Sequence, residues 1–290
     1  MRLGVVIPPT GRWAGLEQEF RWAEGVGYDV AYVYDHLTHP TVPGAWLAEG
    51  FSTLAAAASV THAIDLGTLV ASATLHSPVA LARVAATVDD ISGGRLVLGV
   101  GAGSPRCAAA DRDEQPTPAQ MADRFADVVE GLAAVLGGAT SWRGRTYAFS
   151  GLETAPLPPD RGRPFLMLAA HGPRAIGLAA QHGDGWNTYG GPASVALEPD
   201  DYWRLLAEQV ARMDRACADA GRDPAGQRRS LLLGYGRVRP VGSVAAYVEA
   251  AERAQATGFD ELVVYGPHSP GAGFASDPAV HAEALSRLTA

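Results

Sequence analysis

Short apolar runs rich in β-branched residues alternate along the chain with longer segments in which apolar residues recur at helical spacing. This alternation is typical of repeated strand–helix units, and eight such units are the number that a closed barrel requires. The expected strands are 3–7, 30–34, 64–72, 96–100, 165–169, 185–189, 230–236 and 262–265. The expected helices are 16–27, 46–60, 78–92, 118–136, 173–182, 200–220, 243–257 and 281–288.

The alternation is interrupted over residues 137–164, where Pro156, Pro158 and Pro159 break any regular pattern. We therefore predict an α/β fold, a single (β/α)8 TIM-barrel domain over residues 1–290 with an insertion before its fifth strand. A doubly wound open sheet is the alternative. It lacks support because no Gly-x-Gly-x-x-Gly motif opens a helix after the first strand.

Composition narrows the classes of function. The net charge of −8 argues against general binding to nucleic acids or anionic membranes, because both partners need a basic surface. No window approaches the ~20 apolar residues of a membrane span, and the first apolar run stops at Pro8, too early for a secretory signal. Cys107 and Cys217 lack metal-type spacing and are expected to be buried or half-buried thiols. We expect a soluble, cytoplasmic protein that acts on a small molecule.

In a TIM barrel the chemistry lies just after the carboxyl ends of the strands. Polar residues or glycines follow or end five of the predicted strands. These segments are Asp35-His36, Ser72 to His76, Gly101 to Ser104, His171 to Arg174, and Trp186-Asn187. The sequence therefore predicts one site at this end of the barrel.

Asp35-His36 is the candidate proton-transfer pair. A histidine can exchange protons near neutral pH, and a neighbouring carboxylate can orient it. Because adjacent residues point opposite ways in a strand, Asp35 need not touch His36 and is free to bond the ligand or the barrel backbone. The alternative is a structural histidine that caps a loop. His39 has no companion ligands at suitable spacing, so no metal site is predicted.

The turn that ends the fifth strand is a candidate anion site. Ala169, Ala170, His171 and Gly172 precede Pro173, which is suited to the first turn of a helix. A helix N-terminus offers free N–H groups, and a glycine beside it allows close approach. An ordinary strand-to-helix turn is the alternative. His171 is expected to contribute its backbone rather than act as a catalyst.

Three blocks of the sequence resemble the luciferase-like superfamily, which includes bacterial luciferase. They cover residues 30–37, 66–103 ("LGTLVASATLHSPVALARVAATVDDISGGRLVLGVGAG") and a segment that begins at Pro164 ("PFLMLAAHGPRAIGLAAQHGDGWNT"). A closing segment, "VGSVAAYVEAAERAQATGFDELVVY", is similar to the helix–strand unit that ends members of the superfamily. The resemblance implies a TIM barrel that uses either coenzyme F420 or FMN.

The resemblance also implies roles for individual residues. His36 falls where F420-dependent members keep a histidine beside the reacting ring, and 169–172 falls where they hold the phosphate. A non-proline cis peptide within Thr68–Ala71 is implied behind the ring. The implied cofactor-binding residues are Asp35, Thr68, Leu69, Val70, Ser72, Ala169, Ala170, His171 and Gly172. Residues expected to line the substrate pocket are His76, Ser104, Arg106 and Trp186.

One departure from the superfamily bears on the substrate. Its sugar-phosphate dehydrogenases have a glutamate where this chain has Ser104, and a hydroxyl cannot take that carboxylate's role in proton transfer. We therefore expect a reaction other than sugar-phosphate oxidation.

The Asp-His pair favours coenzyme F420, with hydride transfer to a C=C, carbonyl or imine group and His36 as proton donor or acceptor. FMN-dependent members share much of the pattern, so an FMN-dependent monooxygenase that uses oxygen is the alternative. A non-catalytic cofactor-binding barrel is the third possibility. The resemblance further implies a homodimer and a separate reductase that supplies the reduced cofactor.

Overall fold

The computed structural model describes residues 1–38, 43–269 and 274–289. The strands in these ranges are β1 Arg2–Val6, β2 Val30–Val33, β3 Asp65–Thr68, β4 Ala71–Ser72, β5 Leu96–Gly101, β6 Trp142–Arg143, β7 Ala148–Phe149, β8 Phe165–Ala169, β9 Gly185–Thr188, β10 Arg228–Leu232 and β11 Glu261–Tyr265. The α-helices are α1 Trp13–Val26, α2 Gly50–Ala58, α3 Pro78–Ser92, α4 Pro105–Arg112, α5 Pro118–Leu136, α6 Pro173–His182, α7 Pro199–Asp219, α8 Val244–Thr257 and α9 Pro278–Thr289.

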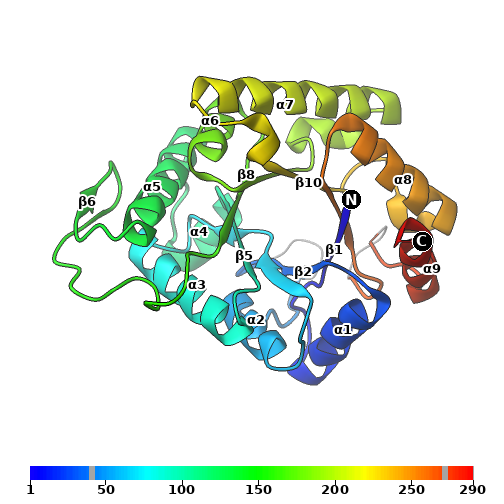
Figure 1. The fold of residues 1–290 in the computed structure, drawn as a ribbon, viewed down its shortest axis with the longest axis horizontal. Helices are drawn as coiled ribbons and strands as arrows, with labels where there is room; N and C mark the ends of the chain where they lie inside the picture. The colour runs from blue at the N-terminus through cyan, green and yellow to red at the C-terminus, as the bar shows by residue number, and fades with distance from the viewer. Residues whose placement is uncertain (39–42, 270–273, 290) are drawn as a thin grey trace.

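The main sheet closes on itself as a parallel barrel. Its strand order is β3-β2-β1-β11-β10-β9-β8-β5-β4, and β3 also pairs with β5, which completes the ring. Because β3 and β4 follow one another along the same side of β5, the described strands fill the eight positions of a TIM barrel. The helices surround the sheet, and α9 meets both α8 and α1, where the two ends of the chain come together (Figure 1). The predicted fold is confirmed.

The two faces of the sheet bury different sets of side chains. On β2, Val30 and Tyr32 point into the barrel, whereas Ala31 and Val33 pack against the surrounding helices. This alternation is the two-residue period of a strand that is buried on both faces. The helices contribute many alanines to the outer layer, which lets them lie close to the sheet.

Two segments differ from the sequence prediction. The third expected strand, 64–72, is divided into β3 and β4, with a cis peptide bond between Leu69 and Val70. The cis bond that the resemblance implied is therefore present. Helix α4 is not among the helices expected from the sequence, because its eight residues show no apolar periodicity. It forms because Ser104 accepts a hydrogen bond from the N–H of Arg106 and Pro105 occupies the first turn.

The irregular segment 137–164 lies outside the barrel, as predicted. Its short strands β6 and β7 pair in antiparallel fashion and project beyond α5 at the left of Figure 1. The segment leaves the strand order of the barrel unchanged, because β5 pairs directly with β8 across it. No α-helix in the described parts of the chain is long and apolar enough to cross a membrane.

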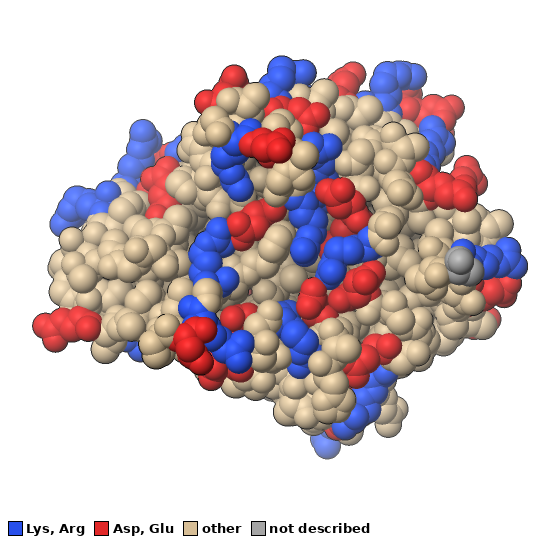
Figure 2. Space-filling view, viewed as in Figure 1, with Lys and Arg blue, Asp and Glu red and all other residues tan. Residues whose placement is uncertain are grey.

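Charged side chains gather where the strands begin. Arg2, the first residue of β1, contacts Asp65 at 2.7 Å and Glu261 at 3.4 Å, which are the first residues of β3 and β11. Arginines and acidic residues are likewise interleaved over the face that Figure 2 shows. This pairing balances opposite charges at the amino-terminal ends of the strands.

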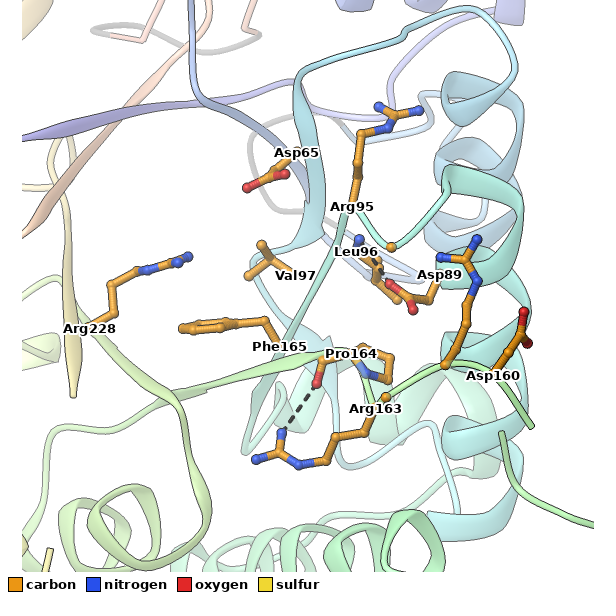
Figure 3. Close-up of a pocket in the computed structure, with 13 residues that line it drawn as sticks. Asp65, Asp89, Arg95, Leu96, Val97, Asp160, Arg163, Pro164, Phe165 and Arg228 are labelled. Carbon is orange, nitrogen blue, oxygen red and sulfur yellow. Dashed lines mark hydrogen bonds between the residues drawn. The ribbon is translucent and has the colours of Figure 1, made fainter. Parts of the chain in front are cut away.

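Arg95, labelled in Figure 3, connects the turns beneath β3 and β5. Its half-buried guanidinium donates hydrogen bonds to the carbonyl oxygens of Ala58, Thr61, Ile64 and Ser92. The oxygens of Ala58 and Ser92 belong to the last residues of α2 and α3, and those of Thr61 and Ile64 precede β3. A single side chain therefore donates to all four oxygens.

We expect Arg95→Leu to lower the free energy of unfolding by about 3 kcal/mol, because several carbonyl oxygens would lose their donor at once. Urea unfolding followed by circular dichroism measures the change. Arg204→Leu is the matched control, since Arg204 is exposed and its ion pair with Asp201 lies within one helix. Its effect should stay below about 0.5 kcal/mol. Equal stability of the two variants would contradict this role for Arg95.

Candidate active site

A cavity of about 380 Å³ opens at the carboxyl ends of the strands. We call it the upper cavity. The residues that line it come from both halves of the chain and from the ends of β2, β4, β5, β8, β9 and β10. They are Asp35, His36, Leu69, Val70, Ser72, Gly101, Ala102, Gly103, Ala169, His171, Asn187, Tyr189, Pro192, Leu232 and Tyr235. Most of the predicted cofactor-binding residues therefore lie around one space.

Asp35 connects the end of β2 to the segment after β3. The residue is 7% exposed, and its Oδ2 accepts a hydrogen bond from the N–H of Ser72 at 3.0 Å. The same oxygen lies 2.7 Å from Nε2 of His76, which carries the hydrogen of that contact. The ring of His76 meets Phe51 edge-on, and His76 lies behind Asp35 rather than among the lining residues. The structure therefore places His76 against Asp35, outside the lining of the upper cavity, and its predicted role in the substrate pocket stays a prediction.

His36 faces the upper cavity from the end of β2. Its ring lies 5.1 Å from that of Tyr34, and its Nδ1 lies 3.5 Å from Sγ of Cys107. Cys107 is fully buried on α4. Asp35 bonds Ser72 and His76. The thiol of Cys107 is one of the groups that orient the imidazole of His36, and it belongs to a helix that the sequence did not predict.

The segment around the cis peptide forms an apolar wall. Leu69 and Val70 line the cavity, whereas the hydroxyl of Thr68 donates to the carbonyl oxygen of Gly99 at 2.7 Å. Thr68 therefore does not line the cavity and instead holds Leu69 and Val70 in place through its bond to β5. Ser72 also lines the cavity, and its hydroxyl lies 2.7 Å from that of Thr74.

In the turn after β8, some residues line the upper cavity and others contribute backbone groups outside its lining. Ala169 and His171 line the cavity, whereas Ala170 is buried and its carbonyl accepts a hydrogen bond from Trp186. Gly172 is the N-cap of α6 and makes no side-chain cap, so the N–H groups of the first turn keep no partner within the helix. A Cβ on Gly172 would meet no atom within 4 Å. The turn thus leaves open space in front of a helix N-terminus.

Three more residues predicted for the substrate pocket are absent from the lining of the upper cavity. Trp186 is fully buried and stacks on Phe259 outside the barrel, because on β9 it is Asn187 that points inward. Ser104 and Arg106 do not line the cavity either, since Ser104 begins α4 and its hydroxyl accepts from the backbone of Arg106.

The sequence did not predict the aromatic side of the cavity. Tyr189 and Tyr235 lie with ring centroids 5.0 Å apart, and Tyr265 donates a hydrogen bond to the hydroxyl of Tyr235 at 2.5 Å. Burial raises the pKa of Tyr189, which keeps its phenol neutral. Among the lining residues there is no arginine or lysine. The cavity therefore suits an uncharged group at its centre.

A second cavity, of about 450 Å³, lies at the opposite end of the barrel (Figure 3). Its charged side chains already serve the fold. Arg95 bonds carbonyl oxygens, Arg163 pairs with both carboxylate oxygens of Asp184, and Arg228 lies 4.0 Å over the ring of Phe165. The upper cavity is thus the better candidate, because it lies where TIM barrels carry their chemistry.

Within residues 1–38, 43–269 and 274–289, no group of three or more His, Cys, Asp or Glu side chains is placed to hold a metal ion. His39, considered above as a possible ligand, lies outside the described residues.

The sequence profile of the family described as luciferase-like monooxygenase matches residues 1–234. A 5,10-methylenetetrahydromethanopterin reductase of Archaeoglobus fulgidus is 29% identical over 64% of this chain and 52% of its own. An F420-dependent glucose-6-phosphate dehydrogenase of Beutenbergia cavernae is 32% identical over 68% of this chain and 58% of its own. The chain thus spans just over half the length of these relatives.

Solved structures share the fold over almost the whole chain. An F420-dependent secondary alcohol dehydrogenase, solved with an F420-acetone adduct, matches with a TM-score of 0.81 and 16% identity, covering 99% of this chain and 97% of that one. A monooxygenase from Streptomyces bottropensis matches with a TM-score of 0.74 and 18% identity over the same shares of the two chains. These likenesses support the TIM-barrel fold.

Proposed function

The chain belongs to the luciferase-like monooxygenase family, and from that membership we propose that it transfers a hydride between coenzyme F420 and a small organic substrate. One observation carries the proposal. A histidine, His36, lines the same upper cavity as the apolar wall of Leu69 and Val70. Leu69 and Val70 would hold the ring system of the cofactor, and His36 would be the residue in the same cavity able to hold a proton.

The residues present fit such a cofactor. The wall at Leu69 and Val70 is apolar, as the face of a ring system requires. The open Cβ position of Gly172 and the N–H groups in the first turn of α6, which receive no side-chain cap, suit a phosphate group. The names of several relatives also carry the coenzyme, among them the Beutenbergia cavernae dehydrogenase and the secondary alcohol dehydrogenase.

When bound, coenzyme F420 would supply the hydride donor or acceptor. His36 would hold the accompanying proton and release it to the substrate atom that becomes negative as the hydride reaches the neighbouring carbon. Reduction of a carbonyl, imine or C=C group balances in this way, with one hydride and one proton added. Asp35 would keep the segment at Ser72 in place and would take no proton itself.

An FMN-dependent monooxygenase is the second candidate, and the family's own description and the Streptomyces bottropensis structure favour it. In that case the apolar wall would exclude water from the site, and a bound reduced flavin would supply the chemistry of oxygen activation. A non-catalytic barrel is less consistent with His36 at the cavity. For either enzyme we propose a homodimer and a separate reductase that supplies the reduced cofactor.

Titration of the protein with each cofactor, followed by quenching of tryptophan fluorescence, tests the proposal. We expect coenzyme F420 to bind with micromolar affinity or better and more tightly than FMN. A clear preference for FMN, or oxygen-dependent turnover with reduced FMN, would replace the proposed reaction by the monooxygenase reaction. Binding of neither would contradict both.

Gly172→Val tests the phosphate turn. The backbone of Gly172 is extended, with φ −89° and ψ 161°, and its Cβ position is open, so valine should fold without strain. The new side chain would occupy the approach to the helix N-terminus, and we expect cofactor affinity to fall about tenfold or more. Circular dichroism confirms the fold and fluorescence titration measures the affinity. A folded variant with parental affinity would show that the phosphate binds elsewhere.

A further inference from the structure

The imidazole of His171 is fixed at the edge of the upper cavity. Tyr189 meets it edge-on at 4.6 Å between ring centroids. On another side the backbone of Gly191 is so close that a Cβ there would lie 3.3 Å from Cβ and Cγ of His171. Gly191 has φ +94°, a left-handed conformation that favours glycine. The ring therefore has little freedom to turn.

Thr188 determines which ring nitrogen carries the hydrogen. Nδ1 of His171 lies 3.0 Å from the Thr188 hydroxyl oxygen. That hydroxyl donates its one hydrogen to Oε1 of Gln209 at 2.8 Å and also accepts the N–H of Gly190. Nε2 of Gln209 donates to the carbonyl oxygen of Gly190 at 2.9 Å, which fixes the orientation of the amide. Since the hydroxyl has no second hydrogen, it accepts from His171, and Nδ1 is the protonated nitrogen.

The second nitrogen of the ring is left as an acceptor. Nε2 diverges from Nδ1 across the imidazole, so it is directed away from Thr188. No described residue makes a hydrogen bond to Nε2, although His171 lines the upper cavity. Burial also lowers the pKa of His171 to about 4, which keeps the ring neutral at pH 7.

We propose that His171 is a specificity-determining residue whose Nε2 accepts a hydrogen bond from a hydroxyl or N–H group of the bound ligand. The inference rests on the proposed function, because it takes that ligand to be the cofactor or its substrate. A lone pair repels an anion, so the side chain does not assist phosphate binding. Within the turn, the backbone at Gly172 serves the anion and the side chain of His171 serves an uncharged donor, such as a hydroxyl of a sugar-alcohol chain.

Nitrogen-15 NMR of the histidine rings tests the first step in the ligand-free protein. We expect His171 to show the neutral form with hydrogen on Nδ1 from pH 5.5 to 8. Its assignment comes from the loss of the signal in His171→Phe, which keeps a flat ring of similar size. Hydrogen on Nε2, or a charged ring at pH 6.5, would overturn the inference.

Addition of saturating coenzyme F420 or FMN, whichever binds, tests the second step. The Nε2 resonance should move upfield as the nitrogen accepts a hydrogen bond, and an unmoved resonance would overturn the inference. If neither cofactor binds, the proposed function fails and the ligand contact of His171 fails with it, whereas a wrong tautomer in the ligand-free protein overturns the inference on His171 alone.

A matched pair of variants separates the hydrogen-bond chain from simple packing. Thr188→Ser keeps the hydroxyl and should keep both the tautomer and the ligand affinity. Thr188→Val has nearly the same shape but cannot accept from Nδ1, so we expect a mixture of tautomers and about tenfold weaker binding. Thr188 is fully buried and does not line the cavity, so neither change touches the ligand. Equal tautomers and affinities in both variants would overturn the role given to Thr188 and His171.

Discussion

Replacing His36 by alanine is expected to lower turnover by about 10²–10⁴-fold, the usual cost of removing a positioned proton donor or acceptor. The imidazole reaches the upper cavity from the end of β2. Among the described residues that line the cavity, the other histidine is His171. His171 cannot replace it, because its Nδ1 is committed to Thr188 and burial lowers its pKa to about 4. Cofactor affinity should change by less than about tenfold, since the apolar wall and the α6 turn stay intact.

Steady-state kinetics on a carbonyl, imine or C=C substrate, together with fluorescence titration, measures the two effects separately. The pH–rate profile of His36→Ala should also lose the inflection that a titrating proton donor contributes. Asp35→Asn is the control. The change to an amide weakens the hydrogen bonds that Oδ2 makes with Ser72 and His76. We therefore expect Asp35→Asn to reduce cofactor affinity more than His36→Ala does. Near-parental turnover in His36→Ala would make His36 structural and leave Tyr34 or water as proton donors to test.

Much of the fold could be predicted because local signals and periodicity agree. Helices α3, α5 and α6 and strand β8 have the bounds expected from the sequence. Each of these three helices has a proline in its first turn, and its end is followed by a glycine. Helix α4 has the same kind of beginning but only two buried residues, Cys107 and Ala108, so its apolar pattern is too short to identify it. The contact between Cys107 and His36 could not be predicted for that reason.

The composition of the site was harder to predict than its position. Strand β9 was expected in the right place, but the sequence does not state which of two neighbouring side chains enters the barrel, so Trp186 was chosen where Asn187 lines the cavity. Tyr235 was expected within the seventh strand. That strand ends at Leu232, and Gly234, with φ +133°, turns the chain so that Tyr235 lies at the cavity.

Gly99→Ala should be the most damaging small change in the fold, because β5 touches the backbone of the neighbouring strand there. A Cβ on Gly99 would lie 2.0 Å from the carbonyl oxygen and 3.1 Å from the carbonyl carbon of Thr68. Neither strand can move aside. The hydroxyl of Thr68 donates to the carbonyl oxygen of Gly99, and the N–H of Leu69 donates to the carbonyl oxygen of Val33. We expect the free energy of unfolding to fall by about 4 kcal/mol, as for severe overpacking of a core.

Urea unfolding and cofactor titration together check this expectation. Moving Thr68 would also displace Leu69 and Val70, so any folded Gly99→Ala protein should bind cofactor more weakly than the parent. Gly177→Ala on α6 is the matched control, because a Cβ there meets no atom within 4 Å and alanine favours a helix. That variant should gain about 0.5–1 kcal/mol of stability. Parental stability and affinity in Gly99→Ala would mean that β5 does not hold the cavity wall in place, and the wall's position would then have to depend on the side-chain contacts of Leu69 and Val70 alone.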